Sequence, residues 1–158
     1  METEKRQSDQ LTETRERVAD ILLVEDDAIH AELTLRALNR CGLGDRVEHV
    51  TDGAEALEYI NSMSLFARHH SMPRVILLDL GLHKLGGLQV LRQLKSNERT
   101  KSIPIVVLTS STMAIEVMES YKLGVNSYVI KPSDAKDFSN VVAGIGHYWL
   151  TINEPPPA

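Results

Sequence analysis

The chain has 158 residues, of which 42% are hydrophobic, and a formal net charge of −5, so it is long enough for one globular domain with its own core. Its acidic charge gives no overall attraction to nucleic acid or to an anionic membrane, and we expect it to bind neither. No apolar run approaches the roughly 20 residues that span a bilayer, and the single cysteine, Cys41, fits a reducing compartment. We therefore expect a cytoplasmic protein.

The two ends of the chain differ from its body in composition. Residues 1–18 are polar and charged with almost nothing to bury, which predicts a flexible arm, either disordered or a frayed helix. Residues 151–158 contain three consecutive prolines, Pro155–Pro157, and are predicted to form a tail because proline cannot continue a helix. The segment between them, 19–150, is predicted to be a single domain.

Apolar runs alternate with segments of helical periodicity along this domain. Four runs lack polar alternation, which is typical of strands buried on both faces of a parallel sheet. These four are Ile21–Val24, Arg74–Asp79, Ile105–Thr109 and Tyr128–Ile130. A weaker strand is predicted at Val47–Thr51.

Helices are predicted between the strands, and Asn61–Pro73 is predicted to be a long loop. The helices are Ala28–Asn39, a helix that starts at Asp52, Leu88–Lys95, a helix capped by Ser111 or Thr112 that runs to Tyr121, and a helix from Asp134 to about Leu150. Alternating strands and helices with right-handed crossovers predict an α/β fold, in which helices cover both faces of a five-stranded parallel sheet.

Polar side chains follow the predicted strands at the sheet edge where open parallel sheets bind ligands. They are Glu25, Asp26 and Asp27 after the first strand, Asp79 after the third, Thr109, Ser110 and Ser111 at the fourth, and Lys131 after the fifth. Clustered carboxylates repel one another, and a hard divalent cation such as Mg²⁺ relieves this repulsion with oxygen ligands. Asp79 can then attack phosphorus as a nucleophile, while Lys131 and the Thr109 hydroxyl stabilise the phosphoryl oxygens.

Each of these residues also has a purely structural interpretation. The acids Glu25–Asp27 could cap a helix, Asp79 could be a satisfied acid at a strand end, and Lys131 could be a solvated loop charge. Thr109 taken alone is more often a helix cap than a ligand. The convergence of all of them at one edge favours the binding site.

Two further features leave alternatives open. His69, His70 and His83 lack metal-ligand spacing and are expected at the surface. The Lys131–Pro132 bond could be cis, which would turn the chain sharply and fix the lysine toward the site, but the sequence does not decide between cis and trans.

Four segments, in this order, resemble the response regulator receiver family. They are Leu22–Asp27 (LLVEDD), Val75–Leu80 (VILLDL), Val106–Ser110 (VVLTS) and Ser127–Pro132 (SYVIKP). The resemblance implies the flavodoxin-like fold of that family, with the strand order 2-1-3-4-5 and the site where the order reverses.

The same resemblance implies roles at the site. Asp79 would be the phosphoacceptor, Asp26 a direct Mg²⁺ ligand and Glu25 a ligand through water. The backbone carbonyl of Gly81 would supply a further ligand.

Three other residues would act on the phosphoryl group or respond to it. Thr109 and Lys131 would contact the group itself. Tyr128, otherwise an ordinary packing residue, would be the switch that turns inward when Thr109 moves toward the phosphate.

A closer resemblance is to single-domain regulators that partner phytochrome-type histidine kinases. It lies in the long loop before the third strand, in Ile103–Ser111 and in the ending His147–Ile152. It implies such a sensor kinase as partner, no DNA-binding output domain, and a homodimer formed through the last helices and the tail. A protein of this kind catalyses its own phosphorylation and slow dephosphorylation but is not a turnover enzyme.

Three positions depart from the family pattern. The family usually has a proline and an aspartate where this chain has His83 and Gly86, and Gly81 lacks the side chain often found there. Losing the proline would loosen the loop after the phosphoacceptor, which leaves open a pseudo-receiver that binds partners without phosphorylation. A Mg²⁺-dependent phosphohydrolase is disfavoured, since such enzymes need an acid where this chain has Gly81.

Overall fold

The computed structural model of the chain describes residues 19–65 and 72–157. Its sheet has five parallel strands in the order β2-β1-β3-β4-β5, which confirms the predicted fold class and topology. The strands are β1 (Ile21–Val24), β2 (Val47–Val50), β3 (Val75–Leu78), β4 (Ile105–Thr109) and β5 (Ser127–Ile130).

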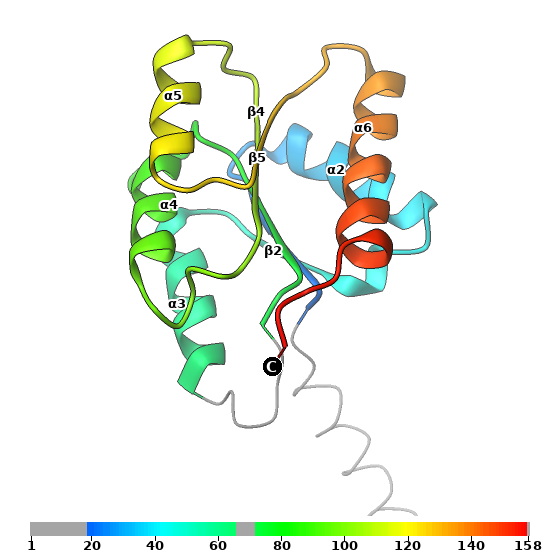
Figure 1. Cartoon of the computed structure of the whole chain (residues 1–158). Helices are drawn as coiled ribbons and strands as arrows, with labels where there is room; N and C mark the ends of the chain where they lie inside the picture. Colours follow the sequence, from blue (N-terminus) through cyan, green and yellow to red (C-terminus); the bar gives the residue numbers. More distant parts are fainter. Residues whose placement is uncertain (1–18, 66–71, 158) are drawn as a thin grey trace, which may run out of the picture.

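Helices cover both faces of the sheet (Figure 1). On one face lie α2 (Ala28–Arg40) and α6 (Ala135–His147), and on the other lie α3 (Gly53–Leu65), α4 (Gly87–Ser96) and α5 (Ala114–Lys122). A short 3₁₀ turn, η1 (Gly44–Arg46), precedes β2, and a π-helical turn, η2 (Tyr148–Ile152), follows α6. Among the helices of the described residues, none has the length and hydropathy that crossing a bilayer would require.

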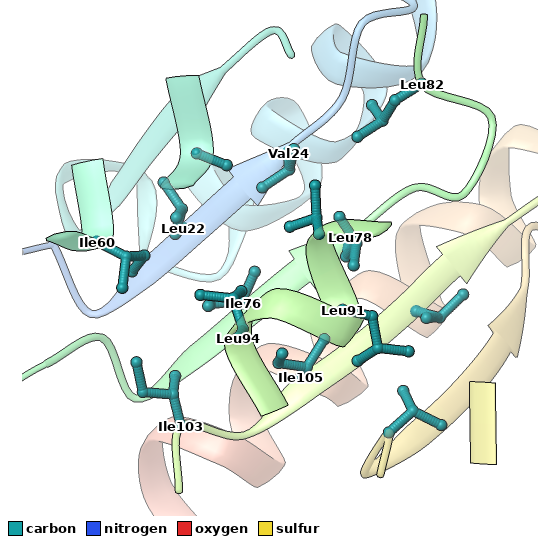
Figure 2. Close-up of a cluster of buried hydrophobic side chains, with 14 of the residues drawn as sticks. Leu22, Val24, Ile60, Ile76, Leu78, Leu82, Leu91, Leu94, Ile103 and Ile105 are labelled. Carbon is teal, nitrogen blue, oxygen red and sulfur yellow. The ribbon is translucent and has the colours of Figure 1, made fainter. Parts of the chain in front are cut away.

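The central strand β3 and its neighbour β1 are buried on both faces. Side chains alternate along a strand, so an uninterrupted apolar run supplies both layers of the core. One layer packs between the sheet and helices α3 and α4, as Figure 2 shows, and includes Leu22, Val24, Ile76 and Leu78. The other layer packs against α2 and α6 and includes Ile21, Leu23, Val75 and Leu77. This burial fixes the carboxyl ends of β1 and β3, which are followed directly by Glu25 and Asp79.

Local signals set most helix ends as predicted. Asp52 Oδ1 accepts a hydrogen bond from the Glu55 backbone N–H at 2.8 Å, and Glu55 Oε2 accepts one from the Thr51 backbone N–H at 3.1 Å, so α3 starts where the sequence predicts. Beyond α2 and α5, Gly42 (φ +80°) and Gly124 (φ +97°) take left-handed backbone conformations that favour glycine.

Two boundary predictions are wrong. Helix α3 continues to Leu65, so the first residues of the predicted loop are helical; no glycine or proline interrupts the chain before Pro73. His69 and His70, in the same predicted loop, lie outside the described residues. Helix α5 has Met113 as its N-cap rather than Ser111 or Thr112.

The end of the chain closes the core. Residue Leu150 of η2 is 6% exposed, and its carbonyl accepts a hydrogen bond from Arg74 Nη1 at 3.1 Å. The neighbouring Trp149 packs against the same core layer as α6 and makes an edge-to-face contact with Tyr148. The helical structure therefore extends through Ile152, two residues beyond the predicted helix end.

Gly87, the first residue of α4, packs directly on the chain that leaves β3. A Cβ atom at Gly87 would lie 2.4 Å from the Asp79 backbone oxygen and 2.6 Å from Leu80 Cα, whereas a Cβ at Gly86 would meet nothing within 4 Å. We expect Gly87→Ala to lower the free energy of unfolding by about 3 kcal/mol, because the clash is with backbone that cannot rotate away.

The matched control is Gly86→Ala, which we expect to leave stability nearly unchanged. Urea unfolding followed by circular dichroism measures both variants. Equal stabilities of the two variants would show that α4 does not press on the end of β3.

Candidate functional site

Charged residues that follow three of the strands meet at the carboxyl edge of the sheet. This edge of the sheet lies toward the top of Figure 1. Oxygens of Glu25, Asp26 and Asp79 all lie within 4.8 Å of one another. Lys131, from the end of β5, forms an ion pair with Glu25, and its Nζ lies 3.7 Å from Asp79 Oδ1. The structure thus brings together four residues from three segments that lie far apart in the sequence.

Asp27 has a different task from its two acidic neighbours. Its Oδ1 accepts hydrogen bonds from the backbone N–H groups of Ile29 and His30, both at 2.9 Å, and so caps α2. The hydrogen bond from the His30 backbone is the main cause that lowers the pKa of Asp27. The helix-cap interpretation therefore holds for Asp27, while Glu25 and Asp26 face the site.

Glu25 is the most buried charged group of the site, at 2% exposed. Burial raises its pKa from 4.5 to about 7; the hydrogen bond from Lys131 opposes this shift, and the nearby Asp79 carboxylate adds to it. Lys131, 9% exposed, also donates a hydrogen bond to His30 Nδ1 at 3.0 Å. Lys131 is therefore the cation that holds this carboxylate cluster together.

Asp26 is bound by the loop that follows Asp79. The backbone N–H of His83 donates to Asp26 Oδ2 at 2.9 Å, and the His83 ring Nδ1 contacts the same oxygen. Partial burial acts to raise the pKa of Asp26, but the hydrogen bonds from His83 outweigh it and the pKa is lowered. The side chain of His83 is 90% exposed, so it lies at the surface as expected, yet it touches a site residue, which the sequence did not indicate.

Thr109 and Tyr128 both form hydrogen bonds with the loop that follows β4. Thr109 is 3% exposed, and its Oγ1 accepts a hydrogen bond from the Ser111 backbone N–H at 3.3 Å. The hydroxyl of the half-buried Tyr128 donates to the Ser111 carbonyl at 3.0 Å. Burial raises the pKa of Tyr128. Ser111 thus links the two residues that the sequence assigns to a switch.

These residues surround a pocket of about 480 Å³. Its lining consists of Asp26, Asp27, His30, Asp79, Leu80, Gly81, His83, Thr109, Ser110, Ser111, Glu116 and Lys131. His30 and Glu116 were not predicted to belong to the site. Both sit near the starts of helices, and only the folding of those helices over the sheet edge brings them to the pocket.

The pocket has the ligand chemistry of a Mg²⁺ site. The three clustered donors are carboxylate oxygens, which suit a hard divalent cation with several retained waters. Gly81 lies in the pocket wall, and a Cβ there would sit 3.5 Å from Asp79 Oδ2. The use of the Gly81 carbonyl as a ligand stays a prediction.

The Lys131–Pro132 bond is trans, since no peptide bond in the part of the chain that the structure describes is cis. The cis alternative is therefore wrong. The trans form is the ordinary preference of X–Pro bonds. The Lys131 backbone N–H still donates to the Thr109 carbonyl at 2.7 Å, so the β4–β5 pairing itself carries the lysine to the site.

Residues 21–143 match the response regulator receiver domain. The chain belongs to the response regulator receiver family. Proteins of this family are signalling proteins rather than turnover enzymes, in agreement with the sequence prediction. The receiver match spans the sheet and α2–α5, together with most of α6.

Several relatives show where this receiver lies within the family. It is 45% identical over 136 residues to FilR2 of Methanothrix harundinacea, described as a methanogenesis regulatory protein, with 86% of each chain covered. The structure of the phosphorylated cyanobacterial phytochrome response regulator RcpA is 36% identical, with a TM-score of 0.79, covering 89% of this chain and 99% of that one. The bacteriophytochrome response regulator RtBRR is 50% identical, with a TM-score of 0.66, covering 89% and 85%. This receiver is therefore close to phytochrome response regulators.

The raised pKa of Glu25 predicts that Mg²⁺ binding depends on pH. Between pH 4.5 and about 7, Glu25 keeps its proton in the folded, cation-free protein, whereas the unfolded chain has already released it. The contribution of Glu25 to the free energy of unfolding is therefore lost as the pH rises through about 7. A bound cation displaces this proton. We expect Mg²⁺ affinity to rise with pH, by at most about tenfold per unit, and to level off above about pH 7.

Calorimetric titration with Mg²⁺ at several pH values checks this dependence, and Glu25→Gln is the control. The variant should bind Mg²⁺ more weakly and lose most of the slope below pH 7. The same slope in both proteins would show that another group releases the proton.

Proposed function

We propose that this receiver accepts a phosphoryl group on Asp79 and passes the signal on by contacts with other proteins. One observation carries the proposal: the Asp79 carboxylate lies in a pocket between two acids that can hold a cation and a buried lysine whose Nζ is 3.7 Å away. The acids supply a cation site and the lysine a fixed positive charge, which are the two things that phosphoryl transfer requires.

The cation would be held by Asp26 and Asp79 directly, by Glu25 through water, and by the Gly81 carbonyl. A Mg²⁺ ion bound there would neutralise charge on the phosphoryl oxygens. The donor set of carboxylate oxygens, together with the raised pKa of Glu25 in the cation-free protein, supports this assignment.

The transfer itself uses the side chain of Asp79. One of its oxygens bonds to phosphorus as the bond from phosphorus to the donor breaks, and the product is an aspartyl phosphate. Lys131 exchanges part of its contact with Glu25 for a phosphoryl oxygen. The Thr109 hydroxyl donates a hydrogen bond to another phosphoryl oxygen, which draws the loop after β4 inward.

The switch follows from this movement of Thr109. Tyr128 is tied to the carbonyl of Ser111, two residues from Thr109, so a shift of that loop releases the Tyr128 hydroxyl. The ring then turns into the space that Thr109 leaves. This changes the surface formed by α5 and β5, to which partners respond.

Receiver domains receive their phosphoryl group from sensor histidine kinases, and we propose a phytochrome-type kinase as the donor here. The 50% identity to RtBRR supports this choice, as does the likeness to RcpA. The name of FilR2, another relative, connects that protein with methanogenesis rather than with light, so the relatives do not agree on one kind of kinase. Direct transfer of a phosphoryl group from a purified phytochrome-type kinase to this receiver is therefore the best test of the partner. The single cysteine and the kinase partner favour a cytoplasmic location, and the acidic charge disfavours nucleic acid as a target.

We also propose that two copies associate through the end of α6, η2 and the tail. Tyr148 and Ile152 of η2 are 46% and 60% exposed, although Trp149 and Leu150 between them pack into the core. Exposed large apolar side chains next to the packed Trp149 and Leu150 offer surface for a second copy.

The alternative function is a pseudo-receiver that binds partners without phosphorylation, which the departures at His83 and Gly86 favour. A phosphodonor distinguishes the two functions directly. Incubation of the protein with acetyl phosphate and Mg²⁺ should add the mass of one phosphoryl group, and hydroxylamine, which cleaves acyl phosphates, should remove it.

The variant Asp79→Asn should gain no mass and should keep the wild-type circular dichroism spectrum, because the amide is of similar size and is not a nucleophile. Asp27→Asn is the matched control, since Asp27 caps α2 and faces the same pocket. Wild-type phosphorylation of Asp79→Asn would place the phosphoacceptor elsewhere, and an unmodified wild-type protein would favour the pseudo-receiver.

The dimer surface can be tested by replacing its apolar side chains. We expect the double variant Tyr148→Ser, Ile152→Ser to sediment as a monomer at concentrations where the wild type is dimeric. Ile29→Ser on α2 is the control, because Ile29 is even more exposed, at 70%, and lies on a different element. Dimers of unchanged stability in the double variant would assign the interface to another surface.

A further inference from the structure

We propose that His30 is a positioning residue for phosphoryl transfer, which holds the Lys131 ammonium beside Asp79 and keeps it from closing on the carboxylate. The inference rests on the proposed function of Asp79 and deepens it, because it explains how the lysine stays available for a phosphoryl oxygen. His30 lies in the first turn of α2 and lines the same pocket as Lys131 and Asp79.

The Lys131 ammonium has three neighbours at the site and forms hydrogen bonds with two of them. Its Nζ donates to Glu25 Oε1 and to His30 Nδ1, the latter at 3.0 Å. Asp79 Oδ1 lies 3.7 Å from Nζ, beyond the roughly 2.7–3.2 Å of an N–H···O hydrogen bond. An ammonium has three N–H groups, so these two bonds leave one donor for a phosphoryl oxygen that arrives on Asp79.

The burial of Lys131 makes the bond to His30 consequential. The side chain of Lys131 is 4% exposed, so water can do little to satisfy an N–H group that loses its acceptor. Without His30, the freed N–H would turn to Asp79, the carboxylate already 3.7 Å away. A closed ion pair with Lys131 would occupy the oxygen that must attack phosphorus. His30 therefore keeps the nucleophile and the cation close but separate.

His30 also differs from the two acidic neighbours of Lys131 in charge and in task. In the proposed function, Glu25 holds the cation through water and Asp79 receives the phosphoryl group, so both change their contacts during transfer. A neutral imidazole accepts a hydrogen bond without cancelling the positive charge of the lysine, which stays available to the phosphoryl oxygens. Because Nδ1 accepts, the ring proton must lie on Nε2.

The backbone of His30 is fixed from both sides. Its N–H donates to Asp27 Oδ1 at 2.9 Å, and its carbonyl accepts a hydrogen bond from Thr34 Oγ1 at 2.9 Å. Thr34 is 1% exposed, so this second contact lies in the interior. The start of α2 thus sets the position of the imidazole, and through it the position of the lysine that follows β5.

A rival explanation gives the same contact the opposite effect. His30 could draw Lys131 away from Asp79, in which case its removal would bring the charge nearer to the phosphoryl group and speed phosphorylation. A positioning role predicts slower phosphorylation, and it predicts that another acceptor in the place of Nδ1 restores the rate.

The first test measures the rate at which acetyl phosphate and Mg²⁺ add a phosphoryl group to each variant. We expect His30→Leu, which removes the acceptor, to react about tenfold more slowly than wild type. His30→Asn should react nearly as fast as wild type, because its amide oxygen is attached to Cγ, as Nδ1 is, and also accepts a hydrogen bond. Circular dichroism confirms that each variant is folded.

The matched control is Glu32→Leu, which places the same leucine on the same helix. The side chain of Glu32 is 62% exposed and does not line the pocket of Asp79. Glu32→Leu should therefore be phosphorylated at the wild-type rate. A rate as slow as that of His30→Leu would assign the effect to α2 as a whole and overturn the role of His30.

The second test examines the hydrogen bond itself and needs no substitution. Nitrogen NMR of the histidine rings in the wild-type protein reports which ring nitrogen carries the proton. We expect the neutral ring of His30 to carry it on Nε2, with Nδ1 as the acceptor. A proton on Nδ1 would exclude the bond from Lys131 and end the proposal.

The kinetic results separate this proposal from the function of Asp79. Equal rates for His30→Leu and wild type would remove His30 from the reaction and leave Asp79 as phosphoacceptor. A faster His30→Leu would establish the rival explanation, and a His30→Asn as slow as His30→Leu would show that the acceptor is not what matters. A wild-type protein that takes up no phosphoryl group would refute the function of Asp79, and the role of His30 with it.

Discussion

The buried ion pair between Lys131 and Glu25 is the interaction on which the functional edge of this protein depends. The two side chains come from β5 and β1, which β3 and β4 separate in the sheet, so the pair forms only when the whole sheet is assembled. Two carboxylates within 4.8 Å of Glu25 would repel it strongly in a buried setting. The lysine offsets this repulsion and lets the acids stay close without a cation.

The same pair makes the site responsive. Lys131 also contacts His30 and lies near Asp79, so its Nζ is shared among several acceptors rather than committed to one. Anything that changes the charge around Asp79, whether a cation or a phosphoryl group, alters this sharing. Because Lys131 follows β5 directly and its backbone N–H is bonded to Thr109, a change in its position is transmitted to the chain that carries Tyr128.

The sequence predicts the sheet and the clustering of acids well, because both follow from local patterns. Short uninterrupted apolar runs are typical of strands buried on both faces, and the carboxyl ends of parallel strands meet at one edge. The end of α3 and the cap of α5 were predicted less well, since neither is marked by a glycine, a proline or a side-chain cap. His30 and Glu116 were missed for another reason. They are helix residues with ordinary local sequences, and only the packing of α2 and α5 over the edge brings them to Asp79.

The loop after Asp79 shows how a departure from a family pattern can change meaning once its contacts are known. A proline at position 83 would fix the backbone but would have no N–H to donate. His83 donates its N–H to Asp26 and adds a ring contact to the same oxygen. Hydrogen bonds to the acidic cluster therefore restrain the loop, in place of the rigid backbone that a proline would give. From the sequence, the missing proline predicts a looser loop. In the structure, the contacts between His83 and Asp26 restrain the loop instead. Histidine in place of proline at position 83 is therefore weak support for a pseudo-receiver that is not phosphorylated. It fits better a receiver in which Asp26 couples the acidic cluster to the loop after Asp79.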